Sequence, residues 1–70
     1  MNNEKILLDE ITANGGELIA NDKELSDLFG YSVSTIRYWR RVLERDNRID
    51  YVCKVIDMRK QGIYTIKENK

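Results

Sequence analysis

The chain has 70 residues, of which 41% are hydrophobic and 34% are charged. This length and balance indicate one small soluble globular domain and exclude a disordered chain. No apolar run is long enough to span a bilayer, and the amino terminus lacks the apolar stretch of a secretory signal, so we expect a cytoplasmic protein without membrane contact.

The sequence contains no histidine, which excludes Cys/His zinc clusters, Ser-His-Asp triads and an imidazole general base. Aspartates and glutamates are plentiful, but no pair is marked as converging in a pocket. We therefore expect no enzymatic activity, metal, cofactor or small-molecule ligand. The single cysteine, Cys53, lies in an apolar strand pattern and is expected to be a buried structural thiol.

The twelve basic and twelve acidic side chains cancel, but they are unevenly distributed along the chain. Residues 1–30 contain two basic and seven acidic side chains, a net charge of −5, and residues 31–70 contain ten basic and five acidic ones, a net charge of +5. Such a charge separation can orient a protein on DNA although the total charge is zero. Any DNA affinity is expected to be modest and steeply dependent on salt.

The first predicted helix covers about residues 3–13, where apolar residues recur at helical spacing. Asn14-Gly15-Gly16 ends it, because asparagine and glycine readily leave the helical region. Leu8 gives this helix one more apolar residue than a single face needs, which either widens the core stripe or marks a protein contact. Residues 17–20 are too few for a helix and can form a short strand.

A second, short helix is predicted over about residues 22–29. Asn21 can cap its start, and Glu24 stands three residues later, as in a capping box. Gly30 follows at the position where a helix leaves the right-handed region. The turn Gly30-Tyr31-Ser32 then leads into a third helix.

This third helix is predicted over about residues 33–46, with Ser32 as its cap and Asn47 after its end. One face is apolar and consists of Val33, Ile36, Trp39 and Leu43. The opposite face carries Ser34, Arg37, Tyr38, Arg41 and Arg45. An arginine-rich face is in general more often solvated than a binding surface. Here it follows a capped helix and a short turn, which is the order of a helix-turn-helix with a second helix suited to phosphates and base edges.

A β-hairpin is predicted over about residues 50–67. Residues 51–56 are rich in β-branched and aromatic side chains, and residues 63–66 follow them after a polar connection that ends in Gly62. Arg59 and Lys60 lie in that connection and are expected to project at the hairpin tip. They could reach a phosphate or the minor groove there, or simply form a polar turn.

The order helix, short strand, helix, turn, helix and hairpin resembles the winged helix-turn-helix superfamily of DNA-binding proteins. The resemblance covers nearly the whole chain. The segments that carry it are Leu25-Ser26-Asp27-Leu28-Phe29-Gly30-Tyr31-Ser32, Ser34-Thr35-Ile36-Arg37 and Gly62-Ile63-Tyr64-Thr65-Ile66, together with Leu43 and Ile49. Two positions depart from the family pattern: Ser26 replaces the usual small residue, and Asn47 stands where glycine is common.

A weaker similarity links Thr35-Ile36-Arg37-Tyr38 to regulators and phage excisionases of the MerR type, in which this helix is short. In this chain the apolar spacing continues through Leu43. The sequence therefore favours the longer helix of an ordinary winged domain.

The winged-helix resemblance implies an α+β fold in which residues 1–70 form a single domain with three helices and a C-terminal wing. It implies a small prokaryotic regulator, of plasmid, phage or chromosomal origin, that binds double-stranded DNA with its recognition helix in the major groove. The wing tip would contact the flanking backbone or the minor groove. The expected DNA-binding residues are Ser34, Thr35, Arg37, Tyr38, Arg41, Arg45, Arg48, Arg59 and Lys60.

Specific DNA sites are usually read by two-fold dimers, so a homodimer is a further expectation. Two other functions stay open at this stage. The domain could bind DNA for replication, partition or recombination, as excisionases do. It could also be a protein-interaction module that uses its acidic half as the contact surface.

Overall fold

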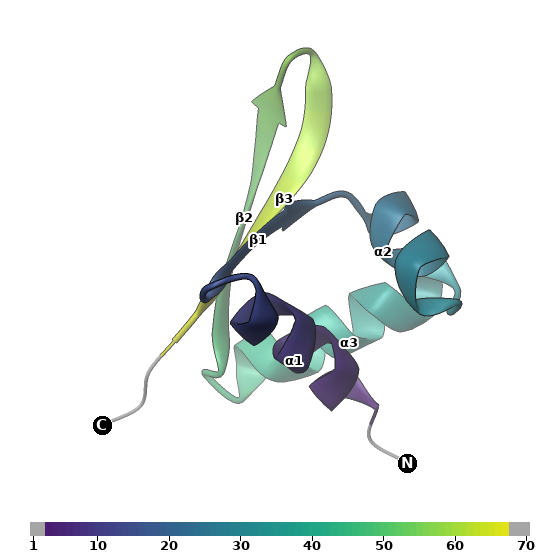
Figure 1. Cartoon of the computed structure of the whole chain (residues 1–70). Helices are drawn as coiled ribbons and strands as arrows, with labels where there is room; N and C mark the ends of the chain where they lie inside the picture. The colour runs from purple at the N-terminus through teal and green to yellow at the C-terminus, as the bar shows by residue number, and fades with distance from the viewer. Residues whose placement is uncertain (1–2, 68–70) are drawn as a thin grey trace.

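The computed structural model describes residues 3–67 and has an α+β architecture of three helices and a three-stranded antiparallel sheet. The elements in chain order are α1 (Glu4–Ala13), β1 (Glu17–Ala20), α2 (Asp22–Phe29), α3 (Val33–Arg45), β2 (Ile49–Ile56) and β3 (Arg59–Ile66). The three helices lie on one side of the sheet, and the β2–β3 hairpin extends beyond them (Figure 1). Among residues 3–67, no helix combines the length and apolar character needed to cross a membrane.

The sheet has the strand order β1-β3-β2, so β3 is central and pairs antiparallel with both neighbours. The short strand β1 ends at Ala20, which lies opposite Gly62 of β3. Beyond Gly62, the hairpin therefore consists of two strands only. This outer half forms the arm that rises above the helices in Figure 1.

The core lies between the helices and the inner face of the sheet, the face toward the helices. Its buried residues come from all three helices and all three strands and are Leu7, Ile11, Ala20, Leu25, Ile36, Trp39, Leu43, Ile49 and Tyr64. Leu8 and Phe29 are partly buried and pack against this cluster. The contact of Leu8 agrees with a widened core stripe on α1. Val42 of α3 is also buried, whereas Val33 is half-buried.

Aromatic side chains attach the turn between α2 and α3 to the core. The ring of Tyr31 meets Trp39 edge-on with a centroid distance of 4.7 Å, and Phe29 lies 6.1 Å from the same indole. Such tilted and edge-to-face pairs add to the free energy gained from burial alone. Trp39 thus contacts both the end of α2 and the turn that follows it, which limits how far α2 and α3 can move apart.

The expectation of a buried Cys53 is wrong, because its thiol is exposed. In the hairpin, Cys53 lies opposite Gly62, at the point where β1 ends. The apolar strand pattern continues past this point, but the helices and β1 no longer cover it. The exposed Val55 and Ile56 belong to the same uncovered arm.

The hairpin turn also differs from the prediction. Asp57 and Met58 form the tip, both with positive φ (52° and 66°), and Met58 is 97% exposed. Two central residues with positive φ are typical of the tight turns whose twist matches that of the strands. Arg59 and Lys60 are therefore the first residues of β3, and neither lies in the connection.

Gly62 does not lie in the turn. It lies where the Tyr51 ring and the backbone of Ala20 come close to β3. A Cβ atom at this position would lie 2.6 Å from Cε1 of Tyr51 and 3.0 Å from the carbonyl oxygen of Ala20. The ring of Tyr51 is itself packed against Tyr64, with a centroid distance of 4.9 Å. Only glycine leaves room for this arrangement.

Replacing Gly62 by alanine is therefore expected to lower the free energy of unfolding by about 1–3 kcal/mol, because the added methyl group displaces the Tyr51 ring or the β1 backbone. Urea denaturation measures this loss. The control Thr65→Val keeps a β-branched residue at an exposed position of the same strand and should change the free energy by less than about 0.5 kcal/mol. Equal losses in both variants would contradict the steric explanation.

Candidate nucleic-acid interface

Capping interactions fix the starts of α2 and α3. The amide of Glu24 donates to Oδ1 of Asn21 at 2.8 Å, and the amide of Asn21 donates to Oε1 of Glu24 at 3.2 Å, which completes the predicted capping box. Gly30 ends α2 in the left-handed region with φ 76°. At the start of α3, the amide of Thr35 donates to Oγ of Ser32, three residues earlier, at 3.2 Å. Both ends of the turn are thus specified locally, and with them the direction in which α3 leaves it.

One face of α3 is open to solvent and basic. Its exposed residues are Ser34, Arg37, Tyr38, Arg41 and Arg45, which we call the α3 basic face. They recur at intervals of three and four and therefore point the same way. Tyr38 is 59% exposed, while the buried Ile36, Trp39 and Leu43 anchor the opposite side of the helix. The helix thus presents three guanidinium groups and a phenol on a firmly packed support.

Thr35 and Arg48 lie beside this face in different settings. Thr35 is half-buried, and its hydroxyl oxygen lies 3.0 Å from that of Ser32, so it takes part in closing the helix start. Arg48 is exposed in the segment between α3 and β2. Only Arg48 of the two has an unburied side chain that could extend toward a partner.

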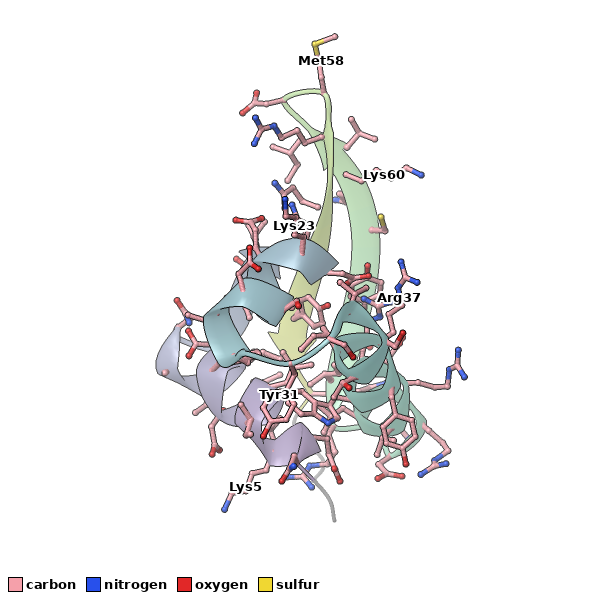
Figure 2. The ribbon with its side chains drawn as sticks, turned by 90° about the vertical axis from the view of Figure 1, so that its right-hand side faces the viewer. Lys5, Lys23, Tyr31, Arg37, Met58 and Lys60 are labelled. Carbon is pink, nitrogen blue, oxygen red and sulfur yellow. The ribbon has the colours of Figure 1, made fainter. Side chains whose placement is uncertain are left out.

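The two basic residues predicted at the hairpin tip lie on opposite faces of the sheet. Side chains alternate along a strand, so Lys60 shares the inner face with Gly62 and Tyr64, whereas Arg59 lies on the other face. In Figure 2, Lys60 and Arg37 project toward the same side of the molecule. The structure therefore brings Lys60, and not Arg59, to the side of the α3 basic face.

Arg40 is a further arginine of α3, and it is not among the residues predicted from the sequence to be functional. Its side chain is only 16% exposed. Nη1 donates to Oδ1 of Asp22 at 2.7 Å and to the hydroxyl of Tyr64 at 3.2 Å, and the guanidinium carbon lies 4.3 Å from the centroid of the Tyr51 ring. One guanidinium group therefore joins α2, α3, β2 and β3. The helical spacing signals only where Arg40 lies, four residues after Ile36 at the border of the apolar stripe, and does not signal its partners.

Asp22 accepts from a second arginine. Nε of Arg37 donates to Oδ2 of Asp22 at 3.0 Å, and the Arg37 side chain is 61% exposed. A second pair joins Arg45 to Asp46 over 3.6 Å, with both side chains largely exposed. Exposed ion pairs of this kind contribute little to stability and exchange readily with other partners. Both arginines can therefore respond to an incoming anion.

The buried cluster shifts the ionisation of its members. Burial raises the pKa of Tyr64 to about 12, although the hydrogen bond and the charge of Arg40 oppose this shift. Burial also raises the pKa of Tyr51, again against the charge of Arg40. Burial lowers the pKa of Arg40, but its hydrogen bonds to Tyr64 and Asp22 outweigh this effect and raise the pKa overall. At neutral pH the cluster thus contains a charged guanidinium group beside two neutral phenols.

Comparisons with protein-family models, with curated proteins and with solved structures found no match for this chain. Within residues 3–67, no group of three or more His, Cys, Asp or Glu side chains could hold a metal ion.

Removing the Arg40 guanidinium group in Arg40→Met should lower the free energy of unfolding by about 1–3 kcal/mol, because Asp22 and Tyr64 lose a partner in a largely buried site. Thermal or urea denaturation measures the loss. Arg41→Met removes the same group from the exposed face and should change stability by less than about 0.5 kcal/mol. Similar effects of the two substitutions would show that the cluster does not stabilise the fold.

The raised pKa of Tyr64 predicts a loss of stability at high pH. The phenol ionises near pH 10.0 in the unfolded chain and near 12 in the folded one, so its contribution is complete below pH 10.0 and is lost as the pH rises toward 12. Two pKa units correspond to about 2–3 kcal/mol. Urea unfolding from about pH 9 upward should show a steeper fall for the wild type than for Tyr64→Phe. Parallel curves for the two proteins would refute this origin of the pH dependence.

Proposed function

We propose that this chain is a winged helix-turn-helix domain that binds double-stranded DNA in a sequence-specific manner and acts as a small transcriptional regulator. The observation that carries the proposal is the α3 basic face, on a helix that starts from a capped turn. Arginine, serine and tyrosine side chains are donors suited to phosphate oxygens and to the acceptors of base edges. The buried face of the same helix holds these donors on a rigid core.

The dimensions of α3 support insertion into the major groove. The helix has 13 residues, a length of about 20 Å, and the B-DNA major groove admits a single α-helix. Ser34, Arg37, Tyr38 and Arg41 would then face base edges or the nearest phosphates. Arg45 and Arg48 would contact the backbone further along. An arginine that binds guanine with two hydrogen bonds contributes about 1–3 kcal/mol of discrimination, whereas phosphate contacts mainly set affinity.

We expect the β2–β3 hairpin, the wing, to contact DNA through Lys60 and not through its tip. The tip consists of Asp57 and Met58, and the Asp57 carboxylate would be repelled by phosphates. Lys60 projects to the side of Arg37 (Figure 2). It would therefore reach the backbone or the minor groove next to the site occupied by α3.

The two arginines on Asp22 suggest how Arg37 could be released to DNA. Asp22 is bound at the same time by the largely buried Arg40 and by the exposed Arg37. When Arg37 turns to a phosphate or a base, Asp22 keeps its shorter bond to Arg40. The cost of freeing Arg37 is thus small, because the half-buried Asp22 carboxylate keeps a charged partner.

The test compares DNA binding by the wild type and by the double variant Arg41→Ala/Arg45→Ala. Fluorescence anisotropy measures the affinity of each protein for a pool of duplexes at several salt concentrations. We expect wild-type affinity to fall linearly with salt on a logarithmic plot, and the variant to bind at least about tenfold more weakly, with a slope reduced by about two. The matched control Lys5→Ala/Lys67→Ala removes two positive charges elsewhere and should keep the wild-type slope.

Circular dichroism checks that all these proteins are folded. Absence of wild-type binding at low salt, or an equal loss in the control, would reject the α3 basic face as a DNA interface. Selection of bound duplexes from a random pool tests specificity. One enriched sequence is expected, and a pool that stays random would reject a sequence-specific regulator in favour of general DNA binding.

A further inference from the structure

The face of the sheet that points away from the helices, which we call the outer face, carries an apolar row with two exposed outer members and a half-buried central one. In the strand register, Ile63 of β3 lies between Ile19 of β1 and Val52 of β2. Ile19 is 51% exposed and Val52 is 49% exposed. An antiparallel sheet with one solvated face normally carries polar residues there. Three adjacent β-branched apolar residues are therefore unusual for a surface in contact with water alone.

Charges of opposite sign flank this row on the same strand and the same face. Asp50 precedes Val52 by two residues, and Lys54 follows it by two, so all three side chains belong to the outer face. Asp50 and Lys54 are about 13 Å apart along the strand and cannot pair with each other. Asp50 is 63% exposed, and among residues 3–67 its ion pair is a 3.6 Å contact with the exposed Lys67. Its carboxylate is thus accessible to a stronger partner.

This order of acid, apolar row and base is self-complementary. A two-fold rotation about an axis that crosses the strands at Val52 reverses the strand direction and brings Asp50 of one copy opposite Lys54 of the other. The same operation places the apolar rows against each other. Thr65 and Gln61 of β3, at the same distances from Ile63, would also meet as a polar pair.

We propose that the outer face is a self-association surface, on which a second copy of this chain packs with antiparallel strands. Val52 and Ile63 of each copy lie near the two-fold axis, and Asp50 of each copy pairs with Lys54 of the partner subunit. Face-to-face sheet packing of this type buries an apolar row at a separation of about 10 Å.

Association through the outer face leaves the α3 basic face uncovered. All three helices lie on the other side of the sheet (Figure 1), so association covers neither α3 nor the inner face that carries Lys60. A pair of copies would present two copies of helix α3. This association involves no DNA, so it is tested independently of the proposed function.

The apolar row has only three residues per copy, whereas stable complexes bury roughly 800 Å² per partner, so we expect a dissociation constant on the order of ten micromolar. Analytical ultracentrifugation of the full chain without DNA measures it. The charge reversals Asp50→Lys and Lys54→Asp should each weaken association at least about tenfold, because like charges then face each other. The double variant Asp50→Lys/Lys54→Asp restores opposite charges across the interface and should return to within about threefold of the wild type.

A second substitution tests whether Val52 of each copy lies at the two-fold axis. Val52→Asp places two carboxylates together and should abolish association up to about 0.5 mM. Val55→Asp adds the same charge to the same strand on the inner face, where Val55 is 68% exposed, and should leave association unchanged.

Circular dichroism shows whether each variant is folded, and the wild-type result does not depend on any variant. A wild type that stays monomeric up to about 0.5 mM would overturn the proposal. So would a double reversal that fails to restore association, or a Val55→Asp effect as large as that of Val52→Asp. Loss of DNA binding with intact association, or the reverse, would separate this inference from the proposed function.

Discussion

The largely buried guanidinium group of Arg40 determines how the parts of this small fold are held together. A charge removed from water needs partners of matching geometry, and here they come from α2 through Asp22 and from the hairpin through Tyr64 and Tyr51. Apolar packing alone tolerates small sliding movements, whereas directional hydrogen bonds do not. The cluster therefore sets the position of α3 relative to the hairpin. Any partner that contacts α3 and Lys60 together depends on this relative position.

The arginines of α3 divide into one that joins the helix to the sheet and three that face the solvent. Arg40 faces inward and is tied to the sheet, while Arg37, Arg41 and Arg45 face outward. Asp22 links the two groups, since it binds Arg40 and Arg37 at once. Asp22 belongs to the acidic part of the sequence, residues 1–30, but it pairs with arginines from the basic part, residues 31–70. The exposed surface of α3 still has an excess of basic groups. A chain of zero net charge can in this way present a strongly basic surface.

Features encoded by neighbouring residues could be predicted from the sequence, and features that depend on distant contacts could not. The capping box at Asn21 and the left-handed Gly30 are local, and both are present. Asn47 adopts the left-handed conformation expected of a residue that ends a helix. The role of Arg40 depends on partners 18 and 24 positions away, which no helical pattern reveals. The hairpin tip was misplaced because Gly62 resembles a turn signal, although its actual cause is the Tyr51 ring packed over it.

The distribution of apolar residues on the sheet indicates how it avoids uncontrolled association. The free edges belong to β1, which has only four residues, to β2, which carries Asp50 and Lys54, and, beyond Gly62, to the outer end of β3, which carries Arg59 and Lys60. Short and charged edges resist pairing with further strands. The apolar row of Ile19, Ile63 and Val52 lies on a face, where another sheet can pack without extending the hydrogen-bonded ladder. Pairing through such a face by a two-fold axis uses each surface once and closes on itself. The same apolar row that would be a hazard on an edge thus favours a pair of defined size and leaves both α3 helices uncovered.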